Sequence, residues 1–376
     1  MLEVVSDPIR VRWLIKGFGP GGAEHLLLAA AATRDRSAFD YSAGYLLPWK
    51  HALVERLEAL DVPVRCLEVT NERDLRWAGR LRRWLRDEPV DIVHVHSPYV
   101  AAIARVVVRS LPRRLRPKVV STEHNAWTTF QGPTRYLNAW TAGLDDAVIA
   151  VSDETRDSMR GRTRARCEVL VHGIDTAAVG LLRTERAAVR KEFGIAPDAF
   201  VVGTVANYHP KKDWPNLLAA MRRVADAHPG ARGLLVGQGP LQHDVEACAR
   251  ALDLGDTVLL PGFRADATRL MSAVDVFVLA SRWEGLPVAM MEALALGRPI
   301  VATSVGGIPA AVVDGVDALL VRPGDPAALA DAVLRVATDA GLAANLADRS
   351  LGRARDFDAA RAQRQIESIY RAVVQR

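Results

Sequence analysis

Short apolar runs alternate with segments of helical periodicity along most of the chain. In the first half the apolar runs "VRWLIKG" (11–17), "YSAGYLL" (41–47) and "DIVHVHS" (91–97) are each followed by a helix-like pattern. The alternation begins again after residue 195, with "FVVGTVA" (200–206) and "VDVFVLAS" (274–281) among its apolar runs. Such alternation is typical of parallel strands joined by crossover helices. The pattern predicts two similar α/β units in tandem.

The length of 376 residues suits two domains of ordinary size. The stretch 173–199 between the two series lacks strand character, so we expect it to connect them. We predict a first domain over 1–173, a second over 174–356, and a terminal helix over 357–376 that packs back on the first domain. Ligands of doubly wound sheets bind beyond the carboxyl ends of the strands, so the loops after the apolar runs should hold the chemistry.

Composition narrows the class of protein. No apolar stretch approaches the roughly 20 residues of a membrane span, and charged residues among the first twelve positions leave no signal-peptide core. We therefore expect a cytoplasmic protein. Its three cysteines, Cys66, Cys167 and Cys248, have no spacing that suits zinc. We expect neither a metal nor a cofactor.

Basic charge is concentrated in the first half of the chain, and the net charge is +5. On a helix over 73–88, the apolar side chains of Trp77, Leu81, Trp84 and Leu85 share one stripe. Exposed, this stripe and its basic rim would lie on the anionic inner face of a membrane; buried, the stripe would face the core. Nucleic acid is not an expected partner, because no recognised binding motif accompanies the charge. The rim consists of Arg76, Arg80, Arg82, Arg83 and Arg86.

A glycine-rich turn follows the first apolar run. Gly17, Gly19 and Gly22 fit the dinucleotide-binding pattern G-x-G-x-x-G. That fingerprint also needs an acidic residue at the end of the second strand, whereas Asp40 stands at the start of this one. An NAD-dependent oxidoreductase is therefore disfavoured. The glycine turn is still suited to offering backbone amides to another anion.

Two glutamates flank an expected helix start in "RWEGLPVAMMEALALG" (282–297). Pro287 suits the first turn of a helix, which places Glu284 in the preceding loop and Glu292 inside the helix. Backbone amides at a helix start attract an anion. A ligand with a phosphate and with hydroxyls on both sides would fit this arrangement. A plain surface helix is the alternative.

An ordered set of motifs over nearly the whole chain resembles the retaining glycosyltransferases of family 4. The resemblance implies a GT-B fold, in which two Rossmann-like doubly wound domains face a cleft, the second domain binds most of the nucleotide-sugar donor, and a terminal helix crosses back to the first. The motifs are "GPGGAE" (19–24), "VHVHSPY" (93–99), "STEHN" (121–125), "AVSDETRDSM" (150–159), "VLVHGID" (169–175), "VANYHPKKDWPNLLAA" (205–220), "LLVGQGPLQHDVE" (234–246), "LLPGFR" (259–264), "VDVFVLASRWEGLPVAMMEALALGRPIVATSVGGIP" (274–309) and "GVDALLVRPGDPAALADAV" (315–333).

The resemblance also implies roles for single residues. Glu284 would bind hydroxyls of the donor sugar, Glu292 the ribose, and Lys212 the diphosphate in place of a metal. His124 would orient acceptor and sugar. The implied catalytic residues are His124, Lys212 and Glu284, and the implied donor-binding residues are Gly21, Gly22, Asn207, Lys212, Gly262, Phe263, Arg264, Glu284, Gly285, Leu286, Pro287, Val288 and Glu292.

The chain departs from the family pattern at two positions. Asn207 stands where most relatives carry an arginine, which removes one of two expected diphosphate cations; Arg282 or the amides of the first-domain glycine turn could replace it. Ala310 stands where many relatives have a glutamate.

The resulting functional hypothesis is a metal-independent, retaining transfer of a sugar from a nucleotide-diphosphate donor to a hydroxyl of an acceptor. The favoured donor is a UDP-sugar, with GDP-mannose second. The acceptor would be a saccharide, a lipid-linked molecule or a small molecule. A sugar-nucleotide epimerase or hydrolase of the same architecture is the alternative.

Overall fold

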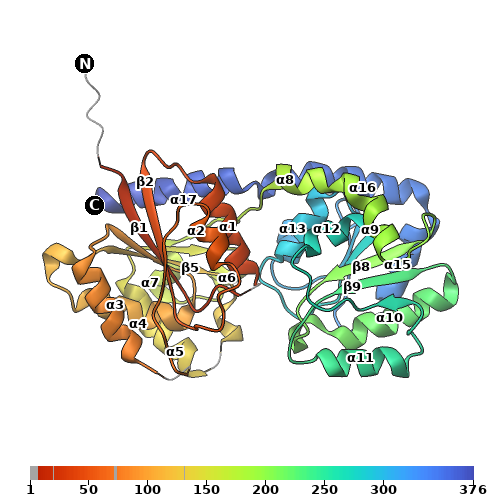
Figure 1. Cartoon of the computed structure of the whole chain (residues 1–376), viewed down its shortest axis with the longest axis horizontal. Helices are drawn as coiled ribbons and strands as arrows, with labels where there is room; N and C mark the ends of the chain where they lie inside the picture. The colour runs from red at the N-terminus through yellow and green to blue at the C-terminus, as the bar shows by residue number, and fades with distance from the viewer. Residues whose placement is uncertain (1–6, 20, 72–73, 131) are drawn as a thin grey trace, which may run out of the picture. The chain divides into compact units, whose positions relative to one another are not determined.

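The computed structural model divides the chain into two compact units (Figure 1). Unit 1 comprises residues 1–173 and 359–376, and unit 2 comprises residues 174–358. The structure describes all residues except 1–6, 20, 72–73 and 131. Each unit contains one sheet of parallel strands flanked by helices, which confirms the predicted tandem of Rossmann-like units.

The sheet of unit 1 has the strand order β3-β2-β1-β4-β5-β6-β7, with all neighbours parallel. The chain order reverses between β1 and β4, which makes this the switch point where open α/β sheets bind ligands. The strands are β1 (Ile9–Ile15), β2 (Phe39–Tyr45), β3 (Val64–Cys66), β4 (Ile92–Val95), β5 (Lys118–Glu123), β6 (Ala147–Ala150) and β7 (Cys167–Val169).

Two separate apolar clusters cover the two faces of this sheet. One joins the sheet to α1 (Gly22–Thr33), α2 (Val54–Glu58) and α17 (Ala359–Val374), and the other joins it to α3 (Arg76–Asp87) and α4 (Pro98–Arg109). Three further helices, α5 (Gly132–Thr141), α6 (Asp153–Asp157) and α7 (Gly161–Arg166), follow β5 and β6. Burial of the apolar faces on both sides is what holds such a three-layer unit together.

Helix α3 settles the two interpretations of the basic segment 73–88. The indole of Trp77 and the side chain of Leu81 are fully buried, and Trp84 and Leu85 are buried with them. The stripe therefore faces the core, which is the second of the two interpretations of this segment. Its rim is engaged locally, since Arg80 donates to the backbone oxygen of Leu67 at 2.8 Å.

The terminal helix α17 belongs to unit 1, as the resemblance implied. Its side chains Ile366 and Tyr370 lie in the same apolar cluster as α1. Its buried Glu367 accepts a hydrogen bond from the hydroxyl of Tyr41 on β2 at 3.1 Å. A buried carboxylate needs such donors, so this pairing fixes the position of the helix on the sheet.

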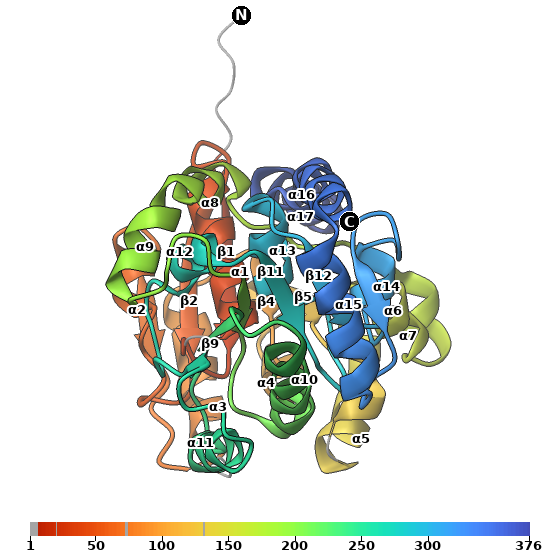
Figure 2. The same cartoon turned by 90° about the vertical axis from the view of Figure 1, so that its right-hand side faces the viewer.

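Unit 2 repeats the architecture with the strand order β10-β9-β8-β11-β12-β13, again all parallel. Strands β9, β11 and β12 of this sheet are labelled in Figure 2. Its switch point lies between β8 and β11. The strands are β8 (Val201–Val205), β9 (Arg232–Val236), β10 (Val258–Leu259), β11 (Val276–Leu279), β12 (Ile300–Thr303) and β13 (Leu319–Val321). The helices are α8 (Thr176–Leu181), α9 (Arg186–Glu192), α10 (Trp214–Ala227), α11 (Gln242–Ala251), α12 (Ala267–Leu270), α13 (Val288–Ala295), α14 (Ile308–Ala311), α15 (Pro326–Thr338) and α16 (Ala340–Ala354).

The stretch 173–199 carries helices and no strand, as its lack of strand character predicted. Helices α8 and α9 occupy it, and the fully buried Val189 of α9 joins the apolar cluster under β8. Among the described residues, no helix is both long and apolar enough to cross a bilayer.

Candidate functional site

The switch point of unit 2 brings together two loops that the sequence separates widely. Lys212 ends a short 3-10 turn, Pro210–Lys212, after β8, and Glu284 lies in the loop after β11. Strands β8 and β11 pair directly, with Phe277 opposite Gly203. Their carboxyl ends therefore present Lys212 and Glu284 at one edge of the sheet.

Lys212 and Glu284 form an ion pair at this edge. The Nζ atom of Lys212 contacts Oε1 of Glu284, and the hydroxyl of Ser281 donates to the same oxygen at 2.6 Å. The side chain of Lys212 is 13% exposed and that of Glu284 is 4% exposed. Lys212 is thus not a solvated surface lysine. Because a buried charge needs its counter-ion, each side chain is held in one position before any ligand arrives.

Two glycines hold the loop that carries Glu284. A side chain at Gly306 would overlap the carbonyl oxygen of Glu284, and one at Gly307 would overlap that of Gly285. The amide of Gly307 donates to this second oxygen at 2.8 Å. Gly306 also has a φ of +57°, which disfavours other residues. The sequence showed these glycines in "GGIP" without a signal of their role.

Helix α13 begins at Val288, with Pro287 as its N-cap residue, one position later than predicted. Glu284 precedes the helix and Glu292 lies one turn inside it, so the two carboxylates flank its start. Among the described side chains, none caps this helix start with a hydrogen bond. The backbone amides at this end are therefore the groups suited to an anion.

Glu292 has an unusual environment for a carboxylic acid. Burial raises its pKa to about 7, while the hydroxyl of Thr268, which donates to its Oε1 at 2.8 Å, acts in the opposite direction. The acid is therefore close to half-ionised at neutral pH. A ligand that donates hydrogen bonds to it would favour the ionised form.

Near Asn207, where the resemblance implies an arginine, the structure places a cationic side chain that the sequence did not single out. Asn207 is exposed at the end of β8. Arg282 is held by Asp213, whose two oxygens lie 3.1 and 3.0 Å from its NH2 and Nε atoms. Burial lowers the pKa of Lys211, and the nearby Glu284 partly offsets this. Lys211 therefore adds a second, partly buried ammonium group beside Glu284, and the Lys-Lys pair was its only signal.

The segment Gly262-Phe263-Arg264 follows β10. Gly262 has a φ of +73°, and its carbonyl accepts from the amide of Gly237 at 3.2 Å. The guanidinium of Arg264 is occupied, because Glu192 and Asp266 each accept from it at 2.8 Å. Its side chain is therefore not free to read a base. The half-exposed ring of Phe263 and the backbone are the available surfaces.

The glycine turn of unit 1 lies where predicted but lacks its dinucleotide partner. Gly21 is the N-cap residue of α1 and Gly22 its first residue. Asp40 pairs with Arg10 near the amino end of β1, whereas the glycine turn follows Ile15 at the carboxyl end. A carboxylate at the opposite edge of the sheet does not reach a ribose held by the turn. The arrangement argues against NAD binding.

His124 belongs to a row of histidines at the carboxyl edge of the unit 1 sheet. His96 Nδ1 lies 3.3 Å from His124 Nε2, and the ring centroids of His124 and His172 are 5.4 Å apart. On the other side of His96, the ring of His94 follows with centroids 4.1 Å apart. Burial lowers the pKa of His124 to about 3 and that of His172 to about 4. His124 is therefore neutral at physiological pH.

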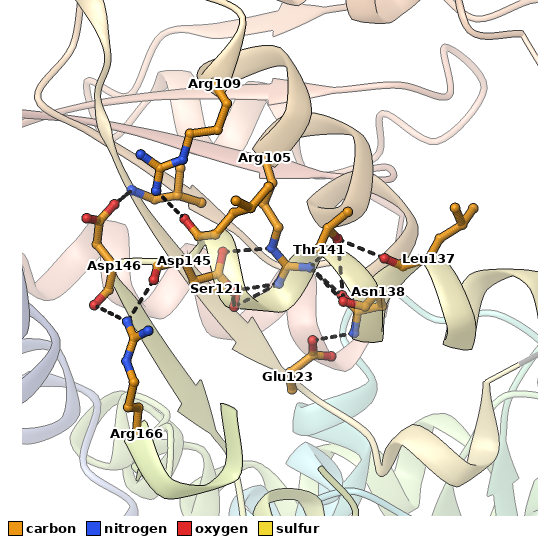
Figure 3. A network of polar contacts seen from close by, with 12 residues as sticks. Arg105, Arg109, Ser121, Glu123, Leu137, Asn138, Thr141, Asp145, Asp146 and Arg166 are labelled. Atoms are coloured by element: carbon orange, nitrogen blue, oxygen red, sulfur yellow. Dashed lines mark hydrogen bonds and ion pairs between the residues drawn. The ribbon is translucent and has the colours of Figure 1, made fainter. Parts of the chain in front are cut away.

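A buried polar network fixes the strand end that carries His124 (Figure 3). Arg105 of α4 donates to both carboxylate oxygens of Asp145, at 2.7 and 2.6 Å, and to Oδ1 of Asn138 at 2.7 Å. The amide of Asn138 donates in turn to Oε1 of Glu123 at 2.7 Å. Glu123 thus serves as an anchor next to His124. Neither Arg105 nor Asn138 gave a signal in the sequence.

Among the described residues, no group of three or more histidine, cysteine or acidic side chains could hold a metal ion. The candidate residues form two sets, one in each unit. His124 and the glycine turn lie in unit 1, and Lys212, Glu284, Glu292 and their neighbours lie in unit 2.

Comparison with known families matches both units. The family model described as Glycosyltransferase Family 4 matches residues 21–178, and the family model described as Glycosyl transferases group 1 matches residues 199–339. Together they cover well over half of the chain.

Two curated relatives and one solved structure illustrate the similarity. The chain is 25% identical over 292 residues to the UDP-Gal:alpha-D-GlcNAc-diphosphoundecaprenol alpha-1,3-galactosyltransferase of Escherichia coli, covering 74% of each. It is 32% identical over 274 residues to the D-inositol 3-phosphate glycosyltransferase of Actinosynnema mirum, covering 65% of this chain and 64% of that protein. The crystal structure of Anabaena HepE with UDP and glucose superimposes with a TM-score of 0.84 at 22% identity, over 96% of this chain and 99% of that one.

Proposed function

The chain is a glycosyltransferase that belongs to family 4 and has the GT-B fold, and we propose that it transfers a sugar from a UDP-sugar donor with retention of configuration. The observation that carries the proposal is the Lys212–Glu284 pair beside the start of α13, at the switch point of unit 2. Support for UDP comes from the solved HepE complex and from the name of the E. coli relative. GDP-mannose is the second candidate donor.

The donor would bind along the carboxyl edge of the unit 2 sheet. We assign the ribose hydroxyls to Glu292, because an ionised carboxylate accepts from two vicinal hydroxyls. The base would lie against Phe263 and the backbone beside it. The diphosphate would meet the backbone N–H groups of Gly285, Leu286 and Val288 and the ammonium groups of Lys211 and Lys212.

Arrival of the diphosphate would redistribute the ion pair. Lys212 is already oriented by Glu284, and a diphosphate gives its ammonium group a second, more highly charged partner. Glu284, still held by Ser281, then accepts hydrogen bonds from the sugar hydroxyls. Both side chains act as preoriented electrostatic groups, the kind of contribution that often dominates catalysis.

The chemical step would be a substitution at the anomeric carbon. The bond from that carbon to the diphosphate oxygen breaks while an acceptor hydroxyl oxygen forms a new bond on the same face. The hydroxyl proton passes to the departing diphosphate oxygen. Lys212 and the helix amides stabilise the leaving group, so this scheme needs no metal, and no Asp-x-Asp motif stands beside Lys212.

His124 would act on the acceptor as a neutral imidazole. Its low pKa, caused mainly by burial, makes a charged form unfavourable, so we assign it orientation by hydrogen bonding rather than proton donation. Gly21 and Gly22 would leave the backbone of unit 1 open to close approach of a ligand.

The donor assignment is tested by thermal-shift screening against UDP, GDP, ADP and TDP. A nucleotide present at 100 times its dissociation constant adds about 2.7 kcal/mol to stability. We expect UDP to give the largest shift, and a larger shift with GDP would overturn the choice of donor. Transfer that stops in excess EDTA and returns with manganese would refute the metal-free scheme.

An epimerase or hydrolase is distinguished by its products. Incubation of the donor alone should leave the sugar nucleotide nearly unchanged if the protein is a transferase. Rapid release of free sugar, or conversion to an isomeric sugar nucleotide without acceptor, would favour the alternative.

A further inference from the structure

Helix α5 buries a polar residue and exposes its large apolar residues. Among its residues, all of which the structure describes, only Asn138 is buried. Its large apolar side chains face outward, with Trp140 87% exposed, Tyr136 66% and Leu137 46%. Figure 3 shows Asn138 directed toward Arg105 while Leu137 points away from the network. A helix of a soluble domain normally does the opposite.

The reversal follows from the polar network described above. Arg105 is completely buried and needs acceptors, and Asn138 supplies its side-chain oxygen from α5. Because Asn138 must face inward, the neighbouring Leu137 is turned outward, and Tyr136 and Trp140 project with it. The network explains why Asn138 is buried. It does not explain why the outer positions are aromatic and aliphatic when polar residues would fit equally well.

The surroundings of this outer face are basic. The segment Gly132–Thr141 contains no acidic residue, and it carries Arg135. Helix α4 packs against α5 and contributes the exposed Val106, and Arg109 of α4 donates to the carbonyl of Leu144 just beyond α5. The acids that follow α5 are already paired: Asp145 with Arg105, and Asp146 with Lys118 at 3.9 Å.

We propose that the outer face of α5, formed by Tyr136, Leu137 and Trp140 together with Arg135 of the same helix, binds the surface of an anionic phospholipid membrane. Tryptophan and tyrosine prefer the boundary between headgroups and acyl chains, where the ring is buried and its polar atom stays wet. Arg135 would meet the negative headgroups, and no acidic side chain of α5 opposes it. This charge complementarity favours lipid over an uncharged partner, and the surface replaces α3 as the membrane-facing element of unit 1.

The surface is linked to the candidate acceptor-side residues. Asn138 on the inner side of α5 holds Glu123, and Glu123 precedes His124 in the chain. Binding of α5 to a bilayer would therefore place the His124 end of the sheet near the membrane surface. The lipid proposal itself does not depend on the identity of the donor, because vesicle binding is measured without any sugar nucleotide.

The test is co-sedimentation of the full chain with vesicles of phosphatidylcholine alone and of phosphatidylcholine with 25% phosphatidylglycerol. We expect binding to the anionic vesicles at low salt, release as salt is added, and at least a tenfold weaker partition when Tyr136, Leu137 and Trp140 are all changed to Ser. The matched control is Leu181→Ser with Val313→Ser, two exposed apolar positions in unit 2 that should leave binding unchanged. Circular dichroism shows whether each variant folds.

A second measurement locates the contact. Brominated phospholipids should quench the fluorescence of Trp140, and Trp140→Phe should keep most of the binding while losing most of that quenching. The proposal is overturned if the wild type ignores anionic vesicles, or if the triple variant binds as well as the wild type. It is also overturned if the wild type is a dimer that the triple variant separates, because the face then belongs to a second copy. Loss of binding only in a variant with Arg76, Arg80, Arg83 and Arg86 changed to Gln would return the contact to α3.

Discussion

Replacement of Glu292 by Gln should make the free protein more stable and the nucleotide complex weaker. Burial raises the pKa of Glu292 to about 7 from an ordinary value of 4.5. As the pH rises from 4.5 to 7, the unfolded chain ionises this group while the folded protein keeps it neutral. Stability is therefore lost over that window and stays lower above it. Gln has no proton to release and escapes this loss.

The magnitude follows from the shift. Each pKa unit corresponds to about 1.4 kcal/mol, so the rise from 4.5 to about 7 sets an upper limit of about 3.5 kcal/mol at pH 8 and almost no difference below pH 4.5. Glu292 is partly accessible to solvent, which reduces the gain below that limit. The assay is hydrogen exchange at the amides of β11 and β12, which reports on unit 2 alone. Asp331→Asn, at an exposed carboxylate on α15, is the matched control.

Binding should change in the opposite direction. A hydrogen bond to a charged group contributes about 1.5–3 kcal/mol, so Glu292→Gln should weaken UDP binding at pH 8 by about 10- to 100-fold. Only about a tenth of Glu292 is ionised at pH 6 and about nine tenths at pH 8, so the ratio of wild-type to variant affinity should rise about ninefold between them. Because the wild type and the variant bind the same nucleotide, the ionisation of its phosphate has the same effect on both affinities and cancels in their ratio. A variant that is no more stable at pH 8 and binds UDP as tightly as the wild type would refute both the burial argument and the ribose assignment.

Four further outcomes are expected. Glu284→Gln should lower kcat by at least tenfold while calorimetry with UDP alone finds a change of less than threefold; an equal loss in both would refute a sugar contact. Gly306→Ala should displace the Glu284 loop and lower both activity and thermal stability, whereas Gly315→Ala, with a similar φ of +71° but open space around it, should lower stability alone. Asn207→Arg should tighten UDP binding at low salt, and unchanged affinity would mean that the position does not face the diphosphate. Denaturant titrations of unit 1 should find that its stability falls as the pH drops below about 6.5, because burial lowers the pKa of all four histidines in the row and only the unfolded chain takes up their protons. The expected loss is about 1.4 kcal/mol per pH unit for each proton. A flat profile between pH 6.5 and 4.5 would contradict the burial of these histidines.

The architecture could be predicted from local pattern because each strand is a short apolar run, and a short run that is buried on both faces fits few structures other than a strand inside a parallel sheet. The same reasoning placed Glu284 before a helix and Glu292 inside it. It did not place Pro287 correctly, because a proline fits the N-cap and the first turn almost equally well. The stretch 173–199 has helices and no strand, as its composition predicted, but its helices α8 and α9 gave little signal because they are short and are stabilised by packing on unit 2.

Contacts over long sequence separations were not predictable in this way. The periodicity of "GPTRYLNAWT" (132–141) would bury its aromatic residues, yet the demand of Arg105 for acceptors turns Asn138 inward and exposes Trp140. Lys212 and Glu284 are 72 positions apart, and only the pairing of β8 with β11 brings them together. When two side chains are far apart in the sequence, the local pattern around each of them does not indicate that they will be in contact.

In the proposed donor site, other charges of unit 2 would compensate for Asn207, where the family resemblance implies an arginine. Lys211, Lys212 and Arg282 supply three positive charges at the ends of β8 and β11, and Glu284 and Asp213 remove two of them. In the proposed donor site, one net positive charge and the amides of α13 would then face the diphosphate. Because the pairs are formed before binding, part of the cost of orienting these side chains is already met by folding. The proposed site would therefore bind the diphosphate through ion pairs that are already formed and through the amides of a helix start, whereas an additional arginine would contribute only its charge.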